Sequence, residues 1–291
     1  MGRFKMENDR LVVTIDDLGA ELVSIYDKKY SRELIWQGDP VWWKRQAPIL
    51  FPNVGKFYGG EYLYQGRHYV QDQHGFARDY VLERVEESPA SVTHRLVSNA
   101  ETRKVYPFDF ELMITHRLDG DKVDIQWQVK NTGDHPMHFT IGGHPGFNVP
   151  VLPDTEYSDY ALKFAEDQDE LHFIHIDMNT GTGLPDKVYT MTLTDHKYQL
   201  RKDLFDLDAL VFDGGQIRQA GIVMPDGSDY LTLLCDGFPN FGIWAAPGAP
   251  FVCLEPWCGR CDNFGYEGEL QDKPGINSLN VDETFKKVYS I

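Results

Sequence analysis

The sequence predicts an all-β protein, a large antiparallel β-sandwich formed by one domain that spans residues 1–291. In many short segments apolar and polar residues alternate, which is typical of strands with one buried face. Turn-forming combinations of Gly, Asn, Asp and Pro separate these segments at short intervals. The chain has no linker rich in Ser, Pro or charged residues, and no internal repeat of about 20–50 residues. These features favour one sandwich over a helical, repeat or multidomain protein.

Individual segments justify the predicted elements. The segment EYLYQGRHYV predicts a hairpin that turns at Gln65-Gly66, and GIVMPDGSDYLTLLCDG predicts another around Pro225-Asp226-Gly227. Only TDHKYQLRKDLFDLDAL shows a spacing near 3.6, which predicts a brief helix. Two long strands joined by an Asp-Gly turn are predicted by FELMITHRLDGD and KVDIQWQVKNTG, with buried faces made of Phe110, Leu112 and Ile114 in the first and Val123, Ile125, Trp127 and Val129 in the second.

The amino-acid composition limits the classes of molecule that the protein is expected to bind. The formal net charge is −17 and Lys and Arg form no block, which argues against nucleic acid and anionic membrane surfaces. Aromatic residues make up 13% of the chain, as expected for strands and for a protein that stacks sugars or other flat ligands. The N-terminus lacks an apolar signal region, and no apolar stretch is long enough to span a membrane. We therefore expect a cytoplasmic monomer or homodimer.

The cysteines raise a redox alternative. Cys235, Cys253, Cys258 and Cys261 all lie in the last quarter of the chain, where reduced thiols are expected in a cytosolic protein. Because only one C-x-x-C pair is present, a structural zinc site is not expected. The stretch Trp257–Cys261 resembles a dithiol motif, which needs a helix after a strand. Only 30 turn-rich residues follow Cys261, so we expect the pair to be a bystander in a loop.

Glu255 is the first candidate for chemistry. It follows the apolar run 251–254 and precedes Pro256, which is expected to end the strand. A carboxylate at the end of a buried strand is desolvated, so its pKa rises and it becomes a candidate general base or acid near neutral pH. The alternative, which the sequence leaves open, is a glutamate that emerges into solvent.

His144 lies in the segment GGHPGFN, where glycines allow close approach of the backbone and Phe147 offers an apolar platform. An imidazole there can exchange a proton near neutral pH, although an ordinary loop histidine is the alternative. His135 and His138 suggest metal ligation together with His144. However, Pro136 excludes a helix between them and a strand would place them on opposite faces, so no metal site is expected.

Two further segments carry ionisable residues. His74 lies in QHGFARD beside Gly75, with Arg78 close behind. Asp206 and Asp208 precede the apolar run ALVF, and we expect one of them to face inward and the other to lie in a solvated turn.

Taken together and in order, these segments resemble the aldose 1-epimerase (galactose mutarotase) family, most closely its LacX-like branch. The resemblance is carried by APILFPNVGKF, QHGFARD, GGHPGFN, DALVF and CLEPWCG, which span residues 47–259, and INSLNVDETFKKVYSI is similar to the closing strand of the family. Each motif is weak alone, whereas five in the same order are specific.

The resemblance implies a β-supersandwich whose concave face holds a sugar, and a proton-transfer mechanism without cofactor or metal. It implies that Glu255 is the base that removes the proton from the C1 hydroxyl, and that His144 is the acid that protonates the ring oxygen. It further implies that His74 is the second histidine of the site and that Asp208 accepts hydrogen bonds from sugar hydroxyls.

One position departs from the family. Lys56 stands where galactose mutarotases carry Arg, and lysine cannot make the planar, bidentate contact of a guanidinium. Arg78 or Arg45 are candidates to compensate. Arg260, in the turn after Glu255, is a less favoured candidate to contact a charged group of the substrate such as a phosphate, because an arginine in such a turn is usually solvated.

Three classes of function remain open from the sequence. The leading one is a mutarotase that acts on a hexose, or alternatively on a hexose 6-phosphate. The second is a non-catalytic sugar-binding or regulatory protein with the same fold, since fold alone does not ensure activity. The third is a glycoside hydrolase or lyase that uses Glu255 with Asp208.

Overall fold

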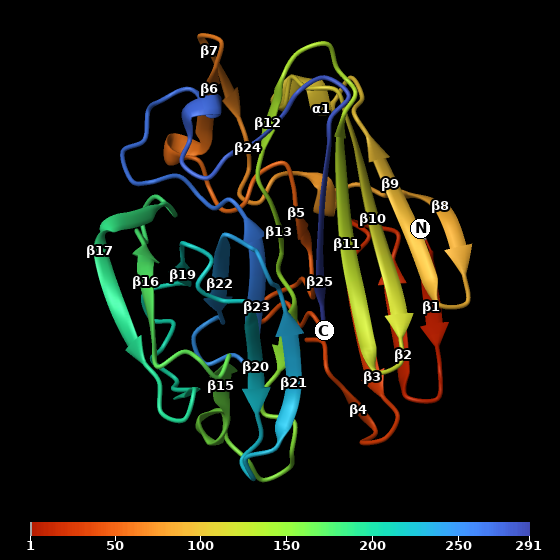
Figure 1. Ribbon diagram of the computed structural model, residues 1–291, viewed down its shortest axis with the longest axis vertical. Helices are drawn as coiled ribbons and strands as arrows, with labels where there is room; N and C mark the ends of the chain where they lie inside the picture. Colours follow the sequence, from red (N-terminus) through yellow and green to blue (C-terminus); the bar gives the residue numbers. More distant parts are fainter. Residues whose placement is uncertain (1) are drawn as a thin grey trace.

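The computed structural model describes residues 2–291 and confirms the prediction of an all-β, antiparallel sandwich. The strands form two large sheets, a smaller N-terminal sheet and two two-stranded ribbons (Figure 1). Within this part of the chain, α-helix is confined to α1 (Thr102–Val105). None of the helices described is long and apolar enough to cross a membrane.

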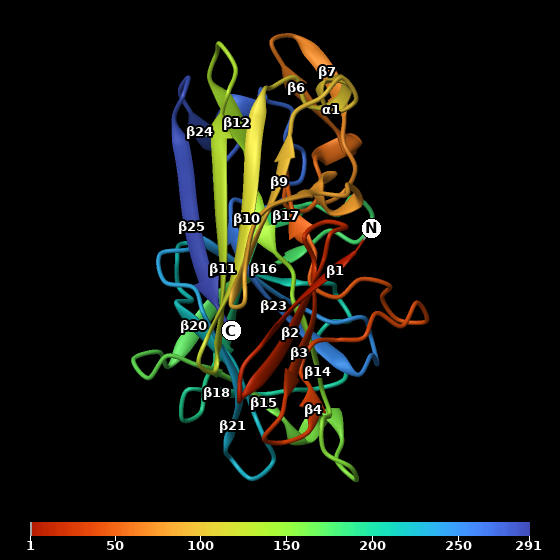
Figure 2. The same ribbon diagram turned by 90° about the vertical axis from the view of Figure 1, so that its right-hand side faces the viewer.

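The first large sheet has nine strands in the order β18-β15-β20-β21-β25-β11-β10-β9-β8. In Figure 2 its long strands β25, β11 and β10 lie side by side along the molecule. Their bounds are β8 Glu83–Ser88, β9 Ser91–Val97, β10 Phe110–Asp119, β11 Lys122–Asn131, β15 Ala161–Phe164, β18 Lys197–Gln199, β20 Gln219–Val223, β21 Asp229–Leu234 and β25 Thr284–Ser290.

The second large sheet follows the order β17-β16-β19-β22-β23-β13-β5, with β14 also paired to β23. Their bounds are β5 Ile49–Leu50, β13 Ile141–Gly143, β14 Gly146–Asn148, β16 Glu170–Ile176, β17 Gly183–Thr192, β19 Leu210–Phe212, β22 Asn240–Trp244 and β23 Phe251–Cys258.

The remaining strands are peripheral. The N-terminal sheet has the order β1-β2-β3-β4, and the ribbons are β6-β7 and β12-β24. Their bounds are β1 Arg3–Glu7, β2 Leu11–Asp16, β3 Leu22–Asp27, β4 Arg32–Glu33, β6 Glu61–Tyr64, β7 Arg67–Val70, β12 Met137–Phe139 and β24 Asn277–Leu279.

The predicted hairpins are present. Strands β6 and β7 turn at Gln65-Gly66, where both residues have positive φ, as a tight two-residue turn requires. Strands β10 and β11 pair over their full length, and the residues expected on their inner faces are buried. Strands β20 and β21 form the third predicted pair.

The core lies between the two large sheets. The ring of Phe51, just after β5, packs edge-on against Phe110 of β10, with centroids 5.1 Å apart. Tyr289 of β25 packs against Trp127 of β11. A Cβ atom added to Gly143 would lie only 2.8 Å from the hydroxyl oxygen of Tyr289. A glycine at 143 therefore lets the nine-stranded sheet approach β13, the strand that leads to His144.

Two local predictions are wrong. Residues 194–210 contain β18 and a series of turns instead of a helix, with i→i−3 hydrogen bonds from the N–H groups of Leu204, Asp206 and Asp208. Pro256 does not end its strand, because β23 continues to Cys258. In the ladder Pro256 pairs with Phe241 of β22, and on its other side it lies beyond the last residue pair of β13 and β23, Gly142 with Trp257, where a missing N–H costs no ladder bond.

Candidate active site

A cavity of about 530 Å³ opens beside the eight-stranded sheet and gathers most of the predicted site residues. Its size is within the usual range of small-molecule sites, roughly 300–1,000 Å³. The predicted residues on its wall are Glu255, His144, His74, Asp208, Lys56 and Arg78. They come from β23, from the β13–β14 connection, from the turn before β19 and from the loops that follow β5 and β7.

Strand pairing brings His144 and Glu255 together. Strand β13 pairs with β23 through Gly142 and Trp257, and β14 pairs with the same strand through Gly146 and Cys253. The register is the same on both sides of the interruption, so His144 stands directly across from Glu255. Directly opposed residues on neighbouring strands have adjacent side chains. Nε2 of His144 lies 3.3 Å from Oε2 of Glu255.

Both groups are buried, and burial shifts both toward their neutral forms. Burial raises the pKa of Glu255 well above its usual value, and the negative charge of Asp208 raises it further, while the indole N–H of Trp257 acts in the opposite direction. Burial lowers the pKa of His144 to about 3, with a further contribution from the charges of Arg78 and Arg45. A carboxyl and an imidazole in contact with such shifts exchange one proton between them instead of holding a stable ion pair.

Tryptophan rings form the apolar wall around this pair. Trp43 stacks on the imidazole of His144 with centroids 4.7 Å apart, and Trp244 meets the same imidazole edge-on at 5.7 Å. The prediction that Phe147 is the platform is wrong, because this residue is fully buried in the core and does not line the cavity. An odd spacing of three residues along an extended chain turns Phe147 to the face opposite that of His144.

His74 is held in a defined tautomer. Its Nδ1 accepts a hydrogen bond of 3.0 Å from the backbone N–H of Gly55. Burial lowers the pKa of His74 well below its usual value, and so do His144 and the positive charges of Arg78, Arg45 and Lys56. The neutral ring therefore carries its proton on Nε2, which lies 3.2 Å from the side-chain amide of Gln73, another residue of the cavity wall.

The two aspartates differ as expected. Asp208 is half-buried at the cavity, whereas Asp206 is exposed in the preceding turn. Asp208 adopts a positive φ of 68°, and its Oδ1 accepts the N–H of Ala209 at 2.7 Å. Because its carboxylate is bound to its own turn, Asp208 is held at a fixed place on the wall.

Two glycines make room for Trp257 on the floor of the cavity. A Cβ on Gly142 would lie 2.4 Å from its indole, and a Cβ on Gly242 would lie equally close to the far side of the ring. Because β13 and β22 flank β23, any larger residue at either position would displace Trp257, which neighbours Glu255 in sequence and in space.

One group of side chains could hold a metal ion. The ligand atoms of His144, Cys253 and Glu255 lie within 4.8 Å of one another, because Cys253 and Glu255 occupy the same face of β23. Metal binding requires the thiolate and the carboxylate. Burial raises the pKa of the Cys253 thiol well above its usual value, and Glu255 raises it further. This chemistry favours an acid–base pair over a metal centre.

The cysteine motif lies in a strand end rather than in the predicted loop. Cys258 is the last residue of β23, and all four cysteines are buried free thiols. Burial raises the pKa of Cys258 to about 12 and also raises that of Cys261. Cys261 nevertheless lines the cavity, which the sequence did not predict.

Arg260 is neither exposed nor at the cavity. Its Nε donates to both oxygens of Asp213, at 2.9 and 3.0 Å, and its Nη1 donates to the carbonyl of Cys261. Its predicted role toward a charged substrate group is therefore wrong. His135 and His138 also lie away from the cavity, near Phe108, so they do not join His144.

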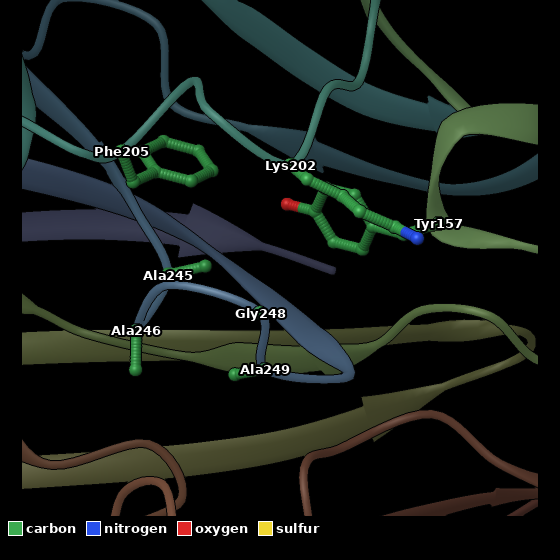
Figure 3. A pocket seen from close by; sticks show the side chains of 7 residues that line it. All are labelled: Tyr157, Lys202, Phe205, Ala245, Ala246, Gly248 and Ala249. Carbon is green, nitrogen blue, oxygen red and sulfur yellow. The ribbon is translucent and has the colours of Figure 1, made fainter.

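Other pockets lack the same chemistry. The pocket in Figure 3 has a volume of about 40 Å³ and is lined by Tyr157, Lys202 and Phe205 together with three alanines and Gly248. It has room for only a few water molecules. A larger pocket of about 430 Å³ near β6 contains a pair formed by His68 and Glu61 at 2.9 Å, but both side chains are open to solvent (62% and 43% exposed) and are not desolvated. Asp262 of the same pocket is neutralised by Lys273 in a buried ion pair of 2.8 Å.

Sequence reasoning missed Trp43, Lys44 and Trp244, although it named Arg45, in the same loop before β5 as Trp43 and Lys44, as a candidate. Trp43, Lys44 and Arg45 line the cavity, and Trp244 joins them from the end of β22. Glu21 fixes this loop, because its Oε1 accepts the backbone N–H groups of Gln46 and Ala47. The pair of tryptophans followed by Lys-Arg in PVWWKRQ was the available signal, but only the fold places it over His144.

Comparison with known proteins identifies the family of this chain. The family model described as aldose 1-epimerase matches residues 2–290. The chromosomal protein LacX of Lactococcus lactis subsp. lactis is 33% identical over 299 residues, which cover 99% of this chain and 98% of LacX.

Solved structures show the same architecture. A galactose mutarotase related enzyme from Lactobacillus acidophilus is 32% identical, with a TM-score of 0.93 over 99% of this chain and 96% of that one. A galactose mutarotase-like protein from Lactobacillus casei is 29% identical, with a TM-score of 0.89 over 99% and 98% of the two chains. The fold is therefore the galactose mutarotase type of β-sandwich, and the chain belongs to the aldose 1-epimerase family.

Proposed function

We propose that this protein is an aldose 1-epimerase that interconverts the α and β anomers of a hexose. The observation that carries the proposal is the distance of 3.3 Å between His144 Nε2 and Glu255 Oε2 on the wall of a sugar-sized cavity. Mutarotation requires one proton to be removed and one to be delivered at neighbouring oxygens, and such a pair supplies both.

The proposed reaction starts with Glu255 as the carboxylate and His144 as the imidazolium. Glu255 takes the proton of the C1 hydroxyl, His144 gives a proton to the ring oxygen, and the bond between C1 and the ring oxygen breaks. The open aldehyde rotates about C1–C2. On reclosure His144 recovers its proton from the hydroxyl formed at ring opening, Glu255 returns its proton to the new C1 hydroxyl, and the opposite anomer results.

Burial supports the ring-opening step. Before it, the site holds two charges, and after it both groups are neutral. Because both pKa values are shifted toward the neutral forms, the desolvated ion pair is the less favourable state and its discharge assists the reaction. On reclosure His144 regains a proton and Glu255 loses one, so both groups recover their charges and the site returns to its starting state.

The remaining residues have binding roles in this proposal. The Nε2–H of His74 is a donor to a sugar oxygen, and Asp208 is an acceptor for a sugar hydroxyl. Trp43 and Trp244 present apolar surface to the C–H groups of a sugar ring.

The experiment is to follow freshly dissolved α-D-glucose and α-D-galactose to anomeric equilibrium by polarimetry. Wild type is expected to accelerate the change, and Glu255→Gln and His144→Asn are each expected to lower kcat by at least about 10²-fold. Glu267→Gln and His172→Asn, both at exposed positions, are the matched controls. Near-normal turnover in either site variant would disprove its role.

The same variants separate the alternatives. A glycosidase using Glu255 and Asp208 would release the alcohol from an aryl glycoside, and would lose this activity in Glu255→Gln. A non-catalytic sugar-binding protein would bind sugar in a calorimeter without accelerating mutarotation. The imidazole in contact with Glu255 favours the mutarotase over both.

A further inference from the structure

The cavity is positively charged in a strongly negative protein. Its wall carries four basic side chains, Lys44, Arg45, Lys56 and Arg78, and only two carboxyl groups, those of Glu255 and Asp208. One of these, Glu255, is held toward its neutral form by burial. The chain as a whole has a formal net charge of −17. Such a local reversal of sign concentrates anionic ligands at the cavity.

Arg78 is half-buried, and its charge is not fully compensated. Its Nη2 donates to the carbonyl of Gln73 at 2.6 Å, but its Nε has no hydrogen-bond partner within residues 2–291. Oδ2 of Asp79 lies 3.9 Å from this Nε, and the other oxygen of the same carboxylate, Oδ1, is 2.7 Å from Nη2 of Arg45. Burial and the charge of Arg45 lower the pKa of Arg78 to about 10. A guanidinium in this setting is stabilised by an added anion.

Lys56 extends this positive surface across the cavity. The Lys56 side chain lies against Gly181, because a Cβ atom added to Gly181 would be only 2.6 Å from Cδ of Lys56. Among the residues that the structure describes, neither Lys56 nor Lys44 forms an ion pair with a carboxylate. The charges of Arg78, Arg45 and Lys56 all act on His74, whose ring centroid is 5.5 Å from that of His144. The positive surface therefore adjoins the acid–base pair.

We propose that Lys56, Arg78 and Arg45 form a subsite for a phosphate ester carried by the aldose, with the anomeric carbon placed at His144 and Glu255. This proposal rests on the proposed mutarotase function and names its substrate class. Several converging cations suit a phosphate dianion better than a single carboxylate, and Lys and Arg are the usual phosphate ligands in proteins.

The test compares anomer exchange, measured by NMR on the anomeric protons, for hexose 6-phosphates, the free hexoses and a hexuronic acid. We expect kcat/KM to be at least about tenfold higher for a hexose 6-phosphate than for the free hexose. This advantage is expected to shrink as salt is added, because ions screen charge. Equal values for the phosphorylated and free sugars would overturn the subsite and leave the mutarotase intact. A preference for the uronic acid would replace phosphate by carboxylate and would also overturn it.

Substitutions of lysine test whether Lys56 is responsible for the preference for the phosphorylated sugar. Lys56→Met is expected to lower kcat/KM for the phosphorylated sugar about tenfold more than for the free sugar, and Lys56→Arg is expected to restore most of this difference. Lys130→Met, on β11 of the other sheet, removes the same charge far from the cavity and is the control. An equal loss on both sugars in Lys56→Met, or the same loss in Lys130→Met, would contradict the assignment.

Binding separates this proposal from the catalytic one. Calorimetry with Glu255→Gln measures affinity without turnover, using a hexose 6-phosphate, the free hexose and inorganic phosphate as ligands. Tighter binding of the phosphorylated sugar, lost in Glu255→Gln/Lys56→Met, would support the subsite even if no sugar is epimerised. Equal affinity for both sugars would overturn the subsite whatever the catalytic result.

Discussion

His144, between β13 and β14, faces Glu255 of the neighbouring strand β23, with Nε2 3.3 Å from Oε2. The ion pair and the neutral pair contain the same number of protons. The pair is therefore competent over the whole pH range in which it holds one proton, and its two macroscopic pKa values set the limits of that range.

This relationship predicts a broad pH profile. A second proton must enter at His144, whose pKa is lowered to about 3, so activity persists well below the ordinary histidine value of 6.5. The last proton leaves from Glu255, whose pKa is raised, so the alkaline limb reports this carboxyl. The measurement is kcat/KM from about pH 4 to about pH 10, with circular dichroism at each pH to confirm folding. An acid limb centred near the ordinary histidine value would contradict this assignment.

Trp43 is expected to be needed for orienting His144. Replacing it by alanine removes the ring stacked on the imidazole, and kcat/KM should fall about tenfold or more. Trp43→Phe keeps an aromatic face and should retain most of the activity. The neighbouring Trp42 is exposed and does not line the cavity, so Trp42→Ala is the control. A similar loss in both alanine variants would indicate a general effect on the loop.

Adding even one methyl group at Gly142 is expected to destabilise the protein. In Gly142→Ala the new Cβ would lie 2.4 Å from the indole of Trp257, so the ring must move and the free energy of unfolding should fall by about 2 kcal/mol. Gly133→Ala is the matched control, because its Cβ would meet its nearest neighbour at 3.4 Å. Urea denaturation of both variants measures the difference. Equal stability of the two would mean that Trp257 has room to relax.

Much of the fold was predictable from alternation alone. The buried faces of β10 and β11 appear in the sequence as every second residue, and their turn is marked by Asp-Gly. The short helix predicted near residue 200 is absent because other backbone can reproduce helical spacing: Leu200 is buried where its N–H bonds the carbonyl of Tyr160, and Leu204 is buried in the first of several i→i−3 turns.

The residues of the candidate site could be predicted from the sequence, whereas their arrangement in space could not. The motifs identified six residues that line the cavity, but the sequence contains no sign that His144 continues the register of β13 and β14 opposite Glu255. Phe147 was misplaced because its motif was treated as a loop, whereas an extended chain turns it into the core. Arg260 was misjudged because its partner, Asp213, lies far from it in sequence.

The cysteine pair is expected to be dispensable for turnover. Because burial raises the pKa of Cys258 to about 12 and raises that of Cys261, neither is a reactive thiolate near neutral pH. Cys258→Ser/Cys261→Ser should keep kcat within about threefold, with a modest loss of stability from burying two hydroxyls. The measurement is polarimetry before and after treatment with an oxidant. Inactivation of the wild type that is absent from the double variant would instead establish a redox switch.

Arg260 is expected to support the fold without selecting the substrate. Arg260→Met leaves the half-exposed carboxylate of Asp213 without its cation, and we expect the free energy of unfolding to fall by about 2 kcal/mol. Since Arg260 does not reach the cavity, the ratio of kcat/KM between phosphorylated and free hexose should stay within about twofold of wild type. Lys56→Met should show the opposite behaviour, with a changed ratio and nearly unchanged stability, because Lys56 is a half-buried side chain on the cavity wall. Thermal denaturation and anomer exchange on the same two variants test both statements. A selective loss on the phosphorylated sugar in Arg260→Met would return this arginine to the substrate site and weaken the case for Lys56.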